Sequence, residues 1–427
     1  MIDADPTSDA RPAAVAGSAP PPGPGRDTAP RPLNPALGAT FAPPVMEARR
    51  WVEGRRFDAG RPLLNLSQAA PADPPPEPLR RAMADAVMTD TSAHLYGPVL
   101  GLPGLRERVA ADWSAAYGGE IGADRVAITS GCNQAFAAAV STLAGPGDEV
   151  ILPLPYYFNH QMWLTMAGLR PVHLETGPDL LPDPEAASAL IGRRTRAIVL
   201  VSPNNPGGVE YPAATLRAMF DLARRHGLAL IVDETYRDFD SRDGAPHDLF
   251  ADPDWDDTLI QLYSFSKAYR LTGHRVGAMV AAPGRLAQVE KWLDTVTICP
   301  TSLGQRAALW GMENLRDWLA GERAEILSRR AAIASGLATL DGWEVTGCGA
   351  YFAYVHHPWA EPSDKVARAL VDRAAVLTLP GTMFGPRRED GGSGRAERSL
   401  RIAFANADRA GIATLVARLA ELGTAPL

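Results

Sequence analysis

The sequence predicts an α/β protein with two domains: a large one, in which helices cover a mostly parallel seven-stranded sheet, and a smaller α+β domain. Two observations support this. From about residue 76 to residue 299, short apolar runs alternate with helical patterns, and the runs are apolar throughout, as in parallel strands that are buried on both faces. After Pro300 the pattern changes to a long helical stretch followed by alternating strands, which is typical of a separate α+β unit.

The strands and helices of the large domain follow one another along the chain. Each strand is a short apolar run, and the helix at 213–227 has an apolar face and ends at a glycine. We expect strands at 125–129, 149–154, 170–175, 197–203, 229–236, 259–266 and 275–282. We expect helices at 106–117, 131–143, 160–168, 186–191 and 213–227.

The elements of the smaller domain are predicted from the same kinds of sequence pattern. We expect a long helical stretch at 304–340, antiparallel strands within 343–356, a helix at 364–374, a strand at 399–405 and a closing helix at 408–423. The charged stretch 386–398, rich in Gly and Arg, is predicted to be a flexible insertion.

The resulting division of the chain has four segments. Residues 1–35 form a Pro- and Gly-rich tail that is predicted to be disordered. Residues 36–75 are an N-terminal arm that contributes to the small domain, residues 76–299 are the large domain, and residues 300–427 are the small C-terminal domain.

Composition and charge exclude several classes of protein. The 427 residues are 46% apolar and 21% charged, and the net charge of −7 offers no basic field for nucleic acid or an anionic membrane. Cys132, Cys299 and Cys348 lie far apart and form neither a disulfide framework nor a metal-ligand pattern. There is no apolar stretch of about 18 residues and no secretory signal pattern. We therefore expect a cytoplasmic protein that binds no metal.

The lysines point to a reactive residue. Of the 42 basic residues only Lys267, Lys291 and Lys365 are lysines. Lysine, unlike arginine, can lose its proton near neutral pH and attack a carbonyl. Around Lys267, two serines and an arginine can form a phosphate cradle, and glycines let the backbone approach a ligand closely. A lysine beside such a cradle suggests a Schiff base with pyridoxal phosphate.

The stretch "SFSKAYRLTGHRVG" at 264–277 resembles the lysine signature of the class I/II aminotransferases, which are pyridoxal-phosphate enzymes of fold type I. The signature has the form S-x-S-K-x-x-x-x-x-G-x-R-x-G, and every polar and glycine position matches. Further matches run in the same order from Asn65 to Phe404, so only the tail lies outside the resemblance. The resemblance implies pyridoxal 5'-phosphate as cofactor, with Ser264, Ser266, Lys267 and Arg275 among the residues that bind it.

Two segments resemble the family's phosphate loop and ring-stacking position. "TSGCNQAF" at 129–136 opens a helix, and helix N-termini bind anions. The resemblance implies phosphate contacts from Gly131, Cys132 and Asn133. "PYYFNH" at 155–160 implies an aromatic ring stacked on the cofactor, for which Tyr157 fits best and Tyr156 is the alternative.

Two strand ends resemble the family's positions for the cofactor ring. In "SPNNPGG", the resemblance implies that Asn205 donates to the cofactor's 3-oxygen. Asp233 ends a strand, where open parallel sheets place their ligands, and an acid there can keep the pyridine nitrogen protonated. The resemblance adds Tyr236 at the 3-oxygen. We expect His160 near Asp233, and a structural role for Glu234.

The family's substrate and partner positions are also matched. The strand at 400–405 implies that Arg401 binds the substrate α-carboxylate as a bidentate pair, with Arg398 as the competitor on the insertion. Phe384 lies in a segment that would line the pocket. The loop at 94–107 implies that Tyr96 reaches the phosphate of a neighbouring subunit, and hence a homodimer.

The implied function is transamination between an L-amino acid and a 2-oxo acid by a ping-pong mechanism, with Lys267, Asp233 and Tyr157 as catalytic residues and small molecules as the substrates. Two departures from the family concern the substrate: "NLSQAAP" at 65–71 replaces a Gly-rich loop, and "NNPGG" lacks a usual Thr. We expect Gln68, Asn205 and Arg401 to contact the substrate. The alternatives are another pyridoxal-phosphate reaction (an oxidase, a lyase or a condensing enzyme), a ligand-sensing DNA-binding regulator, and an inactive homologue.

Overall fold

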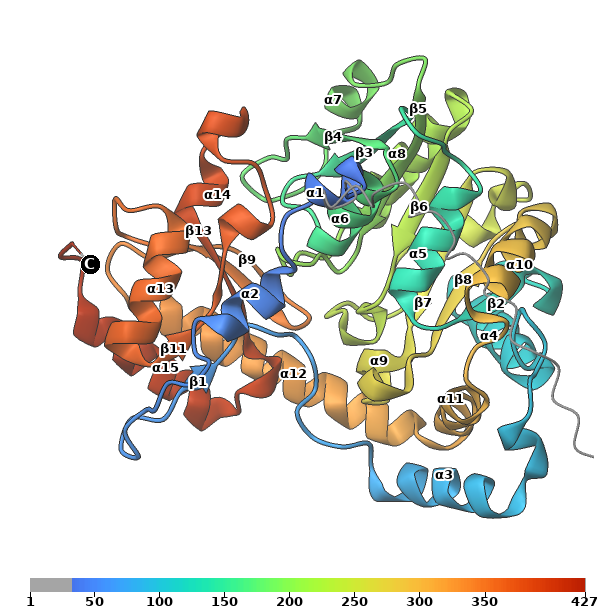
Figure 1. The fold of residues 1–427 in the computed structure, drawn as a ribbon, viewed down its shortest axis with the longest axis horizontal. Helices are drawn as coiled ribbons and strands as arrows, with labels where there is room; N and C mark the ends of the chain where they lie inside the picture. The colour runs from blue at the N-terminus through green and yellow to red at the C-terminus, as the bar shows by residue number, and fades with distance from the viewer. Residues whose placement is uncertain (1–32, 427) are drawn as a thin grey trace, which may run out of the picture.

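The computed structural model describes residues 33–426 as two units, each built on its own sheet (Figure 1). The predicted tail at 1–35 lies almost entirely outside the described residues. The larger sheet has seven strands in the order β2-β8-β7-β6-β5-β3-β4. All neighbouring pairs are parallel except those made by β8, which is antiparallel to both β7 and β2. The predicted fold class is therefore confirmed.

The strands of the large sheet form where the apolar runs predict them. They are β2 (Val126–Thr129), β3 (Glu149–Pro153), β4 (Arg170–Leu174), β5 (Thr195–Val201), β6 (Ala229–Asp233), β7 (Leu259–Ser264) and β8 (Gly277–Val280). Every residue of β6, β7 and β8 is buried, as expected for strands that are covered on both faces.

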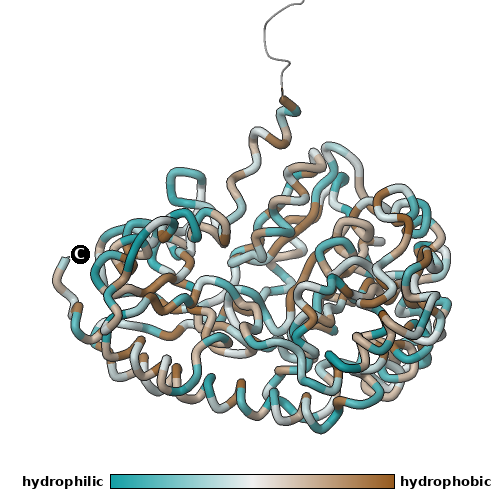
Figure 2. The backbone as a smooth tube through the Cα atoms, turned by 60° about the horizontal axis from the view of Figure 1, so that its bottom comes forward, coloured by the Kyte–Doolittle hydropathy of each residue, from teal (hydrophilic) through white to brown (hydrophobic). Residues whose placement is uncertain are grey.

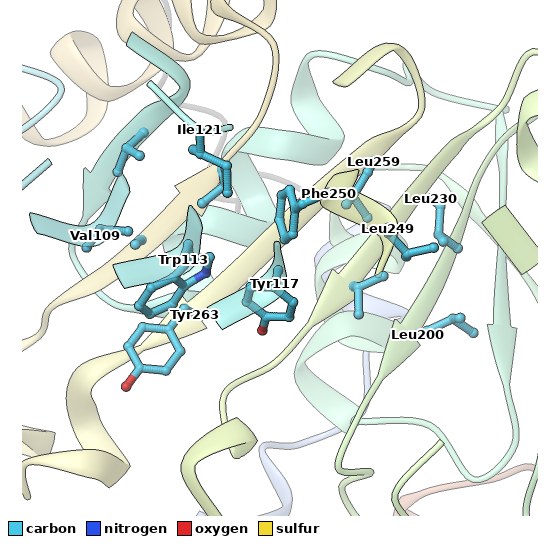
Figure 3. Packing of buried hydrophobic residues seen from close by; sticks show 14 of the residues in the cluster. Val109, Trp113, Tyr117, Ile121, Leu200, Leu230, Leu249, Phe250, Leu259 and Tyr263 are labelled. Atoms are coloured by element: carbon cyan, nitrogen blue, oxygen red, sulfur yellow. The ribbon is translucent and has the colours of Figure 1, made fainter. Parts of the chain in front are cut away.

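Helices cover both faces of this sheet. The helices of the large unit, not all of which lie on the sheet, are α3 (Glu77–Thr89), α4 (Pro103–Tyr117), α5 (Cys132–Ser141), α6 (Phe158–Met166), α7 (Pro184–Ala189), α8 (Ala213–Arg225), the short α9 (Phe265–Ala268) and α10 (Pro283–Thr297). One hydrophobic cluster joins α4 and α8 to one face, and a second joins α5, α6 and α10 to the other. Figure 3 shows part of the first cluster, where Trp113 and Tyr117 of α4 pack beside Tyr263 and Phe250.

The smaller unit is an antiparallel four-stranded sheet in the order β12-β13-β10-β9. Its strands are β9 (Glu344–Gly349), β10 (Phe352–His356), β12 (Leu379–Pro380) and β13 (Ser399–Ala403). Its helices are α12 (Arg316–Leu337), α13 (Ser363–Ala374), α14 (Arg395–Arg398) and α15 (Arg409–Leu422). The N-terminal strand β1 (Leu64–Asn65) pairs with β11 (Val376–Leu377), so the segment before the large unit contributes to this part of the molecule.

Two short helices precede β1, namely α1 (Pro35–Gly38) and α2 (Pro44–Arg50). Both begin at a proline, whose fixed φ and missing N–H suit the first turn of a helix. Ala48 of α2 is fully buried in a cluster with Phe158 of the large unit and Phe384 of the small unit. The helix α2 is therefore packed between the two units (Figure 1).

The helical stretch predicted at 304–340 is two helices, α11 (Ser302–Asn314) and α12, which are separated at Leu315. Ala307, Ala308 and Met312 of α11 join the core of the large unit. Ile333 and Leu337 of α12 join the core of the small unit. The predicted boundary at residue 300 falls just before α11, and α12 is the helix that links the two cores.

The stretch 386–398 is more ordered than its composition indicates, so the prediction of a flexible insertion is wrong for its second half. Arg395 donates to the backbone oxygens of Thr176 and Gly177, both at 3.1 Å, and Ala396 of α14 is buried. An arginine that binds two carbonyl oxygens of the large unit holds this segment in place.

The two units meet where glycines lie opposite glycines. A Cβ built on Gly349 would lie 2.1 Å from the carbonyl oxygen of Gly208, and one on Gly347 would lie 2.3 Å from that of Gly207. Side chains at these positions would separate the backbones, so the loop "NNPGG" uses its glycines for contact with β9.

Hydropathy follows this architecture. In Figure 2 many of the hydrophobic (brown) stretches lie inside the molecule, and the outer coils alternate between hydrophobic and hydrophilic residues. Among residues 33–426, no helix combines the length and hydropathy that a membrane span requires.

Candidate active site

A cavity opens at the carboxyl ends of β5, β6 and β7, where parallel sheets place their ligands. Most of the residues predicted for the cofactor line it, although they come from distant parts of the sequence. The lining residues are Cys132, Asn133, Tyr157, Val201, Asn205, Asp233, Thr235, Tyr236, Ser264, Ser266, Lys267 and Arg275.

Lys267 lies on the single-turn helix α9, directly after β7. Its Nζ atom donates to the carbonyl oxygen of Ala69 at 2.6 Å. Burial, together with the positive charges of Arg275 and Arg401, lowers the pKa of the Lys267 amine to about 8. A substantial fraction of this amine is therefore neutral, and hence nucleophilic, near physiological pH.

Arg275 follows Lys267 after a short loop and faces the start of α5. Its Nη2 atom lies 3.4 Å from the carbonyl oxygen of Ser130, and its Nη1 atom lies 3.5 Å from Ser266 Oγ. Within residues 33–426, no carboxylate lies within ion-pair distance of this guanidinium. The arginine and the first amides of α5 thus form an electropositive corner.

Gly131 completes this corner. It has a φ of 90°, and a Cβ there would lie 2.2 Å from Arg275 Nη2. The missing side chain leaves room for the guanidinium beside the helix N-terminus.

The two serines beside Lys267 have different roles. Ser264 accepts a hydrogen bond from the Ser266 amide at 3.2 Å and so caps α9. The hydroxyl of Ser266 faces Arg275.

Asp233 ends β6 on the opposite side of the cavity. Its carboxylate accepts the Thr235 amide at 3.0 Å, and His160 Nε2 lies 3.3 Å from Oδ2. Burial opposes ionisation, but the contacts with His160 and Thr235 lower the pKa of Asp233 overall. The predicted proximity of His160 and Asp233 is found, and stacking on Phe136, with ring centroids 3.9 Å apart, holds the imidazole.

Tyr157 lines the cavity, whereas Tyr156 does not. The Tyr157 hydroxyl accepts a hydrogen bond from Asn159 at 2.9 Å, and burial raises its pKa to about 12. Tyr156 packs instead beside His173, with ring centroids 5.4 Å apart. Of the two alternatives from the sequence, Tyr157 therefore has the position to contact a ligand in the cavity.

Arg401 of β13 reaches the same region from the small unit. It is 2% exposed; its Nη1 donates to Asn205 Oδ1 at 3.0 Å, and its Nη2 donates to the carbonyl oxygen of Ser67. The guanidinium lies 5.0 Å and 4.8 Å from the ring centroids of Phe352 and Phe384. Burial lowers its pKa to about 10, so it remains charged at neutral pH. The competitor Arg398 is exposed at the end of α14.

The remaining predicted residues lie in different places. The Tyr236 ring centroid is 5.9 Å from Lys267 Nζ, inside the cavity. Gln68 is not among the residues that line the cavity; its side-chain oxygen accepts from Arg49 at 2.6 Å and its backbone oxygen accepts from Asn406 at 3.0 Å. Tyr96 is 81% exposed and is not brought to the cavity of its own chain.

Glu234, for which the sequence predicts a structural role, is fully buried and is not among the residues that line the cavity. It accepts hydrogen bonds from Tyr117 at 2.6 Å and from Gln261 at 2.8 Å. The neighbouring residues Asp233 and Glu234 thus face opposite sides of the chain, because successive side chains of an extended segment alternate.

Sequence reasoning missed four contributors to the site, and one of them is Val201 at the end of β5, which lines the cavity. Thr235 lines the cavity and binds Asp233, a contact that the sequence "DET" could have suggested. The backbone oxygens of Ser67 and Ala69 have no sequence signal, because every residue carries a carbonyl group.

Comparison with known proteins agrees with this geometry. Residues 61–419 match the family described as aminotransferase class I and II. A probable aspartate/prephenate aminotransferase from Thermus aquaticus is 29% identical over 332 residues, which cover 76% of this chain and 85% of the relative. An arginine–pyruvate transaminase from Pseudomonas aeruginosa is 31% identical over 337 residues, which cover 78% of this chain and 84% of the relative.

A comparison with a solved structure shows that the fold is also that of an aminotransferase. The aspartate aminotransferase from Thermus thermophilus with maleate superposes with a TM-score of 0.82 at 26% identity, covering 92% of this chain and all of that one. Sequence and fold thus agree over nearly the whole described chain. The chain belongs to the class I and II aminotransferase family, and it is an enzyme that transfers amino groups between amino acids and 2-oxo acids.

Proposed function

We propose that this aminotransferase works with pyridoxal 5'-phosphate, held at Lys267, and by a ping-pong mechanism. The observation that carries the proposal is the position of the Lys267 amine. It is largely buried, has a pKa of about 8, and lies in a cavity between an ionised aspartate and an arginine that has no carboxylate partner among residues 33–426. When bound, the cofactor supplies an aldehyde that condenses with amines and a ring that accepts electrons from the substrate Cα.

The corner around Arg275 fits a phosphate group. The guanidinium, the hydroxyl of Ser266 and the amides at the start of α5 are all donors, and phosphate oxygens are acceptors only. The absence of a side chain at Gly131 keeps this corner open. Ser264, Cys132 and Asn133 complete the set of residues that would surround the phosphate.

The opposite side of the cavity fits a pyridine ring. Asp233 would accept a hydrogen bond from a protonated ring nitrogen and hold the proton there, since its own pKa is low. Tyr157 would stack on the ring, and Asn205 and Tyr236 would bind the 3-oxygen. The contact with His160 supports the ionised form of Asp233.

The substrate would lie between Lys267 and Arg401. Arg401 would bind the α-carboxylate in a bidentate pair, which orients the Cα–H bond toward the Lys267 amine. Lys267, once the substrate amine has taken its place, would remove the Cα proton as a general base and then donate a proton to complete the transfer. Because the first oxo acid leaves before the second binds, the kinetics should be ping-pong.

The names of the relatives favour transamination over the oxidase, lyase and condensing reactions, since those compared above are called aminotransferases or transaminases. Their named substrates are aspartate and prephenate in one case and arginine in the other.

We also propose that two copies of the chain form a homodimer with shared sites. Leu95 and Tyr96 are adjacent, 62% and 81% exposed, and follow the end of α3, where Met88 is 82% exposed. An apolar surface of this kind is suited to a second protein surface. Mixing the variants Lys267→Ala and Tyr96→Ala tests the proposal, because a mixed dimer has one site with both residues intact. Activity that neither parent shows supports sharing, and no recovery in mixed dimers contradicts it.

The cofactor proposal is tested by adding pyridoxal phosphate to the purified protein, reducing it with borohydride and locating the added mass. The chain has three lysines, so the experiment has few possible answers. We expect stoichiometric label on Lys267 and none on Lys291 or Lys365. Label that stays unchanged in the Lys267→Ala variant would refute the proposal.

A further inference from the structure

A second cavity, of about 420 Å³, lies on the other face of β7 from the candidate active site. Successive side chains of a strand point to opposite faces. At the end of β7, Ser264 lines the candidate active site, whereas its neighbour Tyr263 lines the second cavity. We call it the rear cavity; Trp113 of α4, Arg237 after β6 and Met312 of α11 also line it.

Arg237 brings to the rear cavity a guanidinium that has no acceptor. The guanidinium carbon lies 4.0 Å from the ring centroid of Trp113 and 4.7 Å from that of Tyr117, so two aromatic rings hold it in place. Its Nη1 atom is buried and has no hydrogen-bond partner among residues 33–426. The adjacent Asp238 binds the hydroxyl of Tyr263 instead, at 2.7 Å.

A buried guanidinium without an acceptor is costly. An N–H group that leaves water without gaining a partner loses its hydrogen bond to solvent, and a positive charge adds to that loss. In the part of the chain that the structure describes, no carboxylate lies within ion-pair distance of Arg237, because the nearby Glu234 faces His247 at 3.4 Å. An anionic oxygen in the rear cavity would supply the missing acceptor.

The charges around the rear cavity favour an anion. Arg108 and Asp112, both on α4, pair with each other at 2.9 Å. Burial raises the pKa of Asp238, which opposes its ionisation. Arg316, the first residue of α12, is an exposed lining residue and adds a positive charge. Together with Arg237, these residues make the lining more positive than negative.

The rest of the lining suits a flat apolar group. Trp113 and Tyr263 lie side by side (Figure 3), with ring centroids 4.9 Å apart. Phe265 and Tyr269 are stacked with centroids 6.2 Å apart, and both line the rear cavity. An aromatic ring can pack against such walls, while a carboxylate attached to it accepts from the guanidinium of Arg237.

We propose that the rear cavity is a second ligand site, separate from the site of amino transfer, in which Arg237 binds the carboxylate of an aromatic acid. The residues that line the rear cavity and those that line the candidate active site are two different sets. The site therefore does not depend on the cofactor proposal.

The test is an NMR titration of the full-length protein labelled with ¹³C at its methionine methyl groups. The chain has ten methionines, and Met312→Leu identifies the signal of Met312. Benzoate should shift this signal in a saturable way. Benzamide lacks the charge and acetate lacks the ring, so each should bind at least about 10-fold more weakly. If benzoate leaves the Met312 signal unchanged, the proposal is wrong.

Two arginine variants separate the rear cavity from the active site. Arg237→Met removes the charge from the rear cavity and should weaken benzoate binding, followed at Met312, by at least about 10-fold. Arg401→Met removes the cation of the proposed substrate site and should leave the affinity measured at Met312 unchanged. An equal loss in the two variants would mean that the shift originates in the active site, which contradicts the proposal.

A further pair of variants tests the charge without removing a buried group. Ala115 lines the rear cavity, whereas Ala111 does not, and both are exposed on α4. Ala115→Glu should weaken benzoate about 3-fold through repulsion between two exposed like charges, and it should leave benzamide unaffected. Ala111→Glu is the control and should change neither affinity. Identical benzoate affinities in the two glutamate variants would overturn the assignment of an anion site.

Discussion

The amine of Lys267 lies 2.6 Å from the carbonyl oxygen of Ala69, a residue 198 positions earlier in the chain. Two residues before Ala69, the carbonyl oxygen of Ser67 accepts a hydrogen bond from Arg401. One short segment of the N-terminal arm therefore contacts both of the cations to which the proposed mechanism assigns ligands. The four predictions below concern these cations and the contact between the two units.

Replacing Lys267 by alanine should lower the rate of amino transfer by at least about 10²-fold, because it removes the proposed cofactor attachment and the general base together. Steady-state rates and the visible absorbance of the loaded protein measure the effect. Lys291→Ala is the control, since that lysine is exposed on α10. Loss of the absorbance with full activity retained would be incompatible with the mechanism.

The stability of the protein without cofactor should rise with pH between about 8 and 10.5. The folded protein holds the Lys267 pKa near 8, below its ordinary value of 10.5, so in this window the unfolded chain binds more protons than the folded one. The gain is at most roughly 3 kcal/mol, and it is absent below the folded pKa, where both states are protonated.

Urea unfolding at a series of pH values measures this gain. Lys267→Met lacks the titrating group, so its stability relative to the parent protein should be greatest below pH 8 and should diminish as the pH rises to about 10.5. Parallel pH profiles for the two proteins would show that the amine is not shifted.

Replacing Arg401 by lysine should raise the KM for amino acids by about 10- to 100-fold, because lysine cannot form the bidentate pair with a carboxylate. Steady-state kinetics with a good amino donor measure the change. The matched control is Arg398→Lys, because Arg398 is exposed and lies just before the strand that carries Arg401. If Arg398→Lys raised KM and Arg401→Lys did not, the carboxylate site would have to be reassigned.

Gly349→Ala should destabilise the fold by about 1–3 kcal/mol, because the new Cβ would lie 2.1 Å from the carbonyl oxygen of Gly208 and force the two units apart. Gly321→Ala is the control, because Gly321 lies within α12 and a Cβ there would meet open space. This substitution should stabilise the protein by about 0.5–1 kcal/mol, since alanine favours the helix over glycine. Urea unfolding measures both, and equal midpoints for the two variants would contradict the close contact.

Much of the fold could be predicted because local patterns reflect burial. The seven strands of the large sheet are apolar runs, and all seven form within two or three residues of the predicted bounds. Two errors have physical causes. The break between α11 and α12 at Leu315 has no glycine or proline to mark it, and Arg395 orders a stretch that composition alone presents as flexible.

The candidate site was predictable to the extent that its chemistry depends on side-chain type. Lys267, Asp233 and Arg401 each combine a reactive or charged group with a position at a strand or its end. Choosing Tyr157 over Tyr156 required the structure, because two adjacent tyrosines have the same local pattern and only packing directs one of them into the cavity.

The sequence by itself predicted which residues are candidates for the chemistry, because reactive side chains, strand periodicity and the motifs that resemble the family are all properties of the local chain. Only the tertiary structure decided how Asn205 meets Arg401, and how the segment 67–69 reaches Lys267 and Arg401. These contacts join residues that are 196, 198 and 334 positions apart, and two of them use backbone carbonyls, which every residue possesses. Long-range packing, to which local sequence patterns are insensitive, sets their positions.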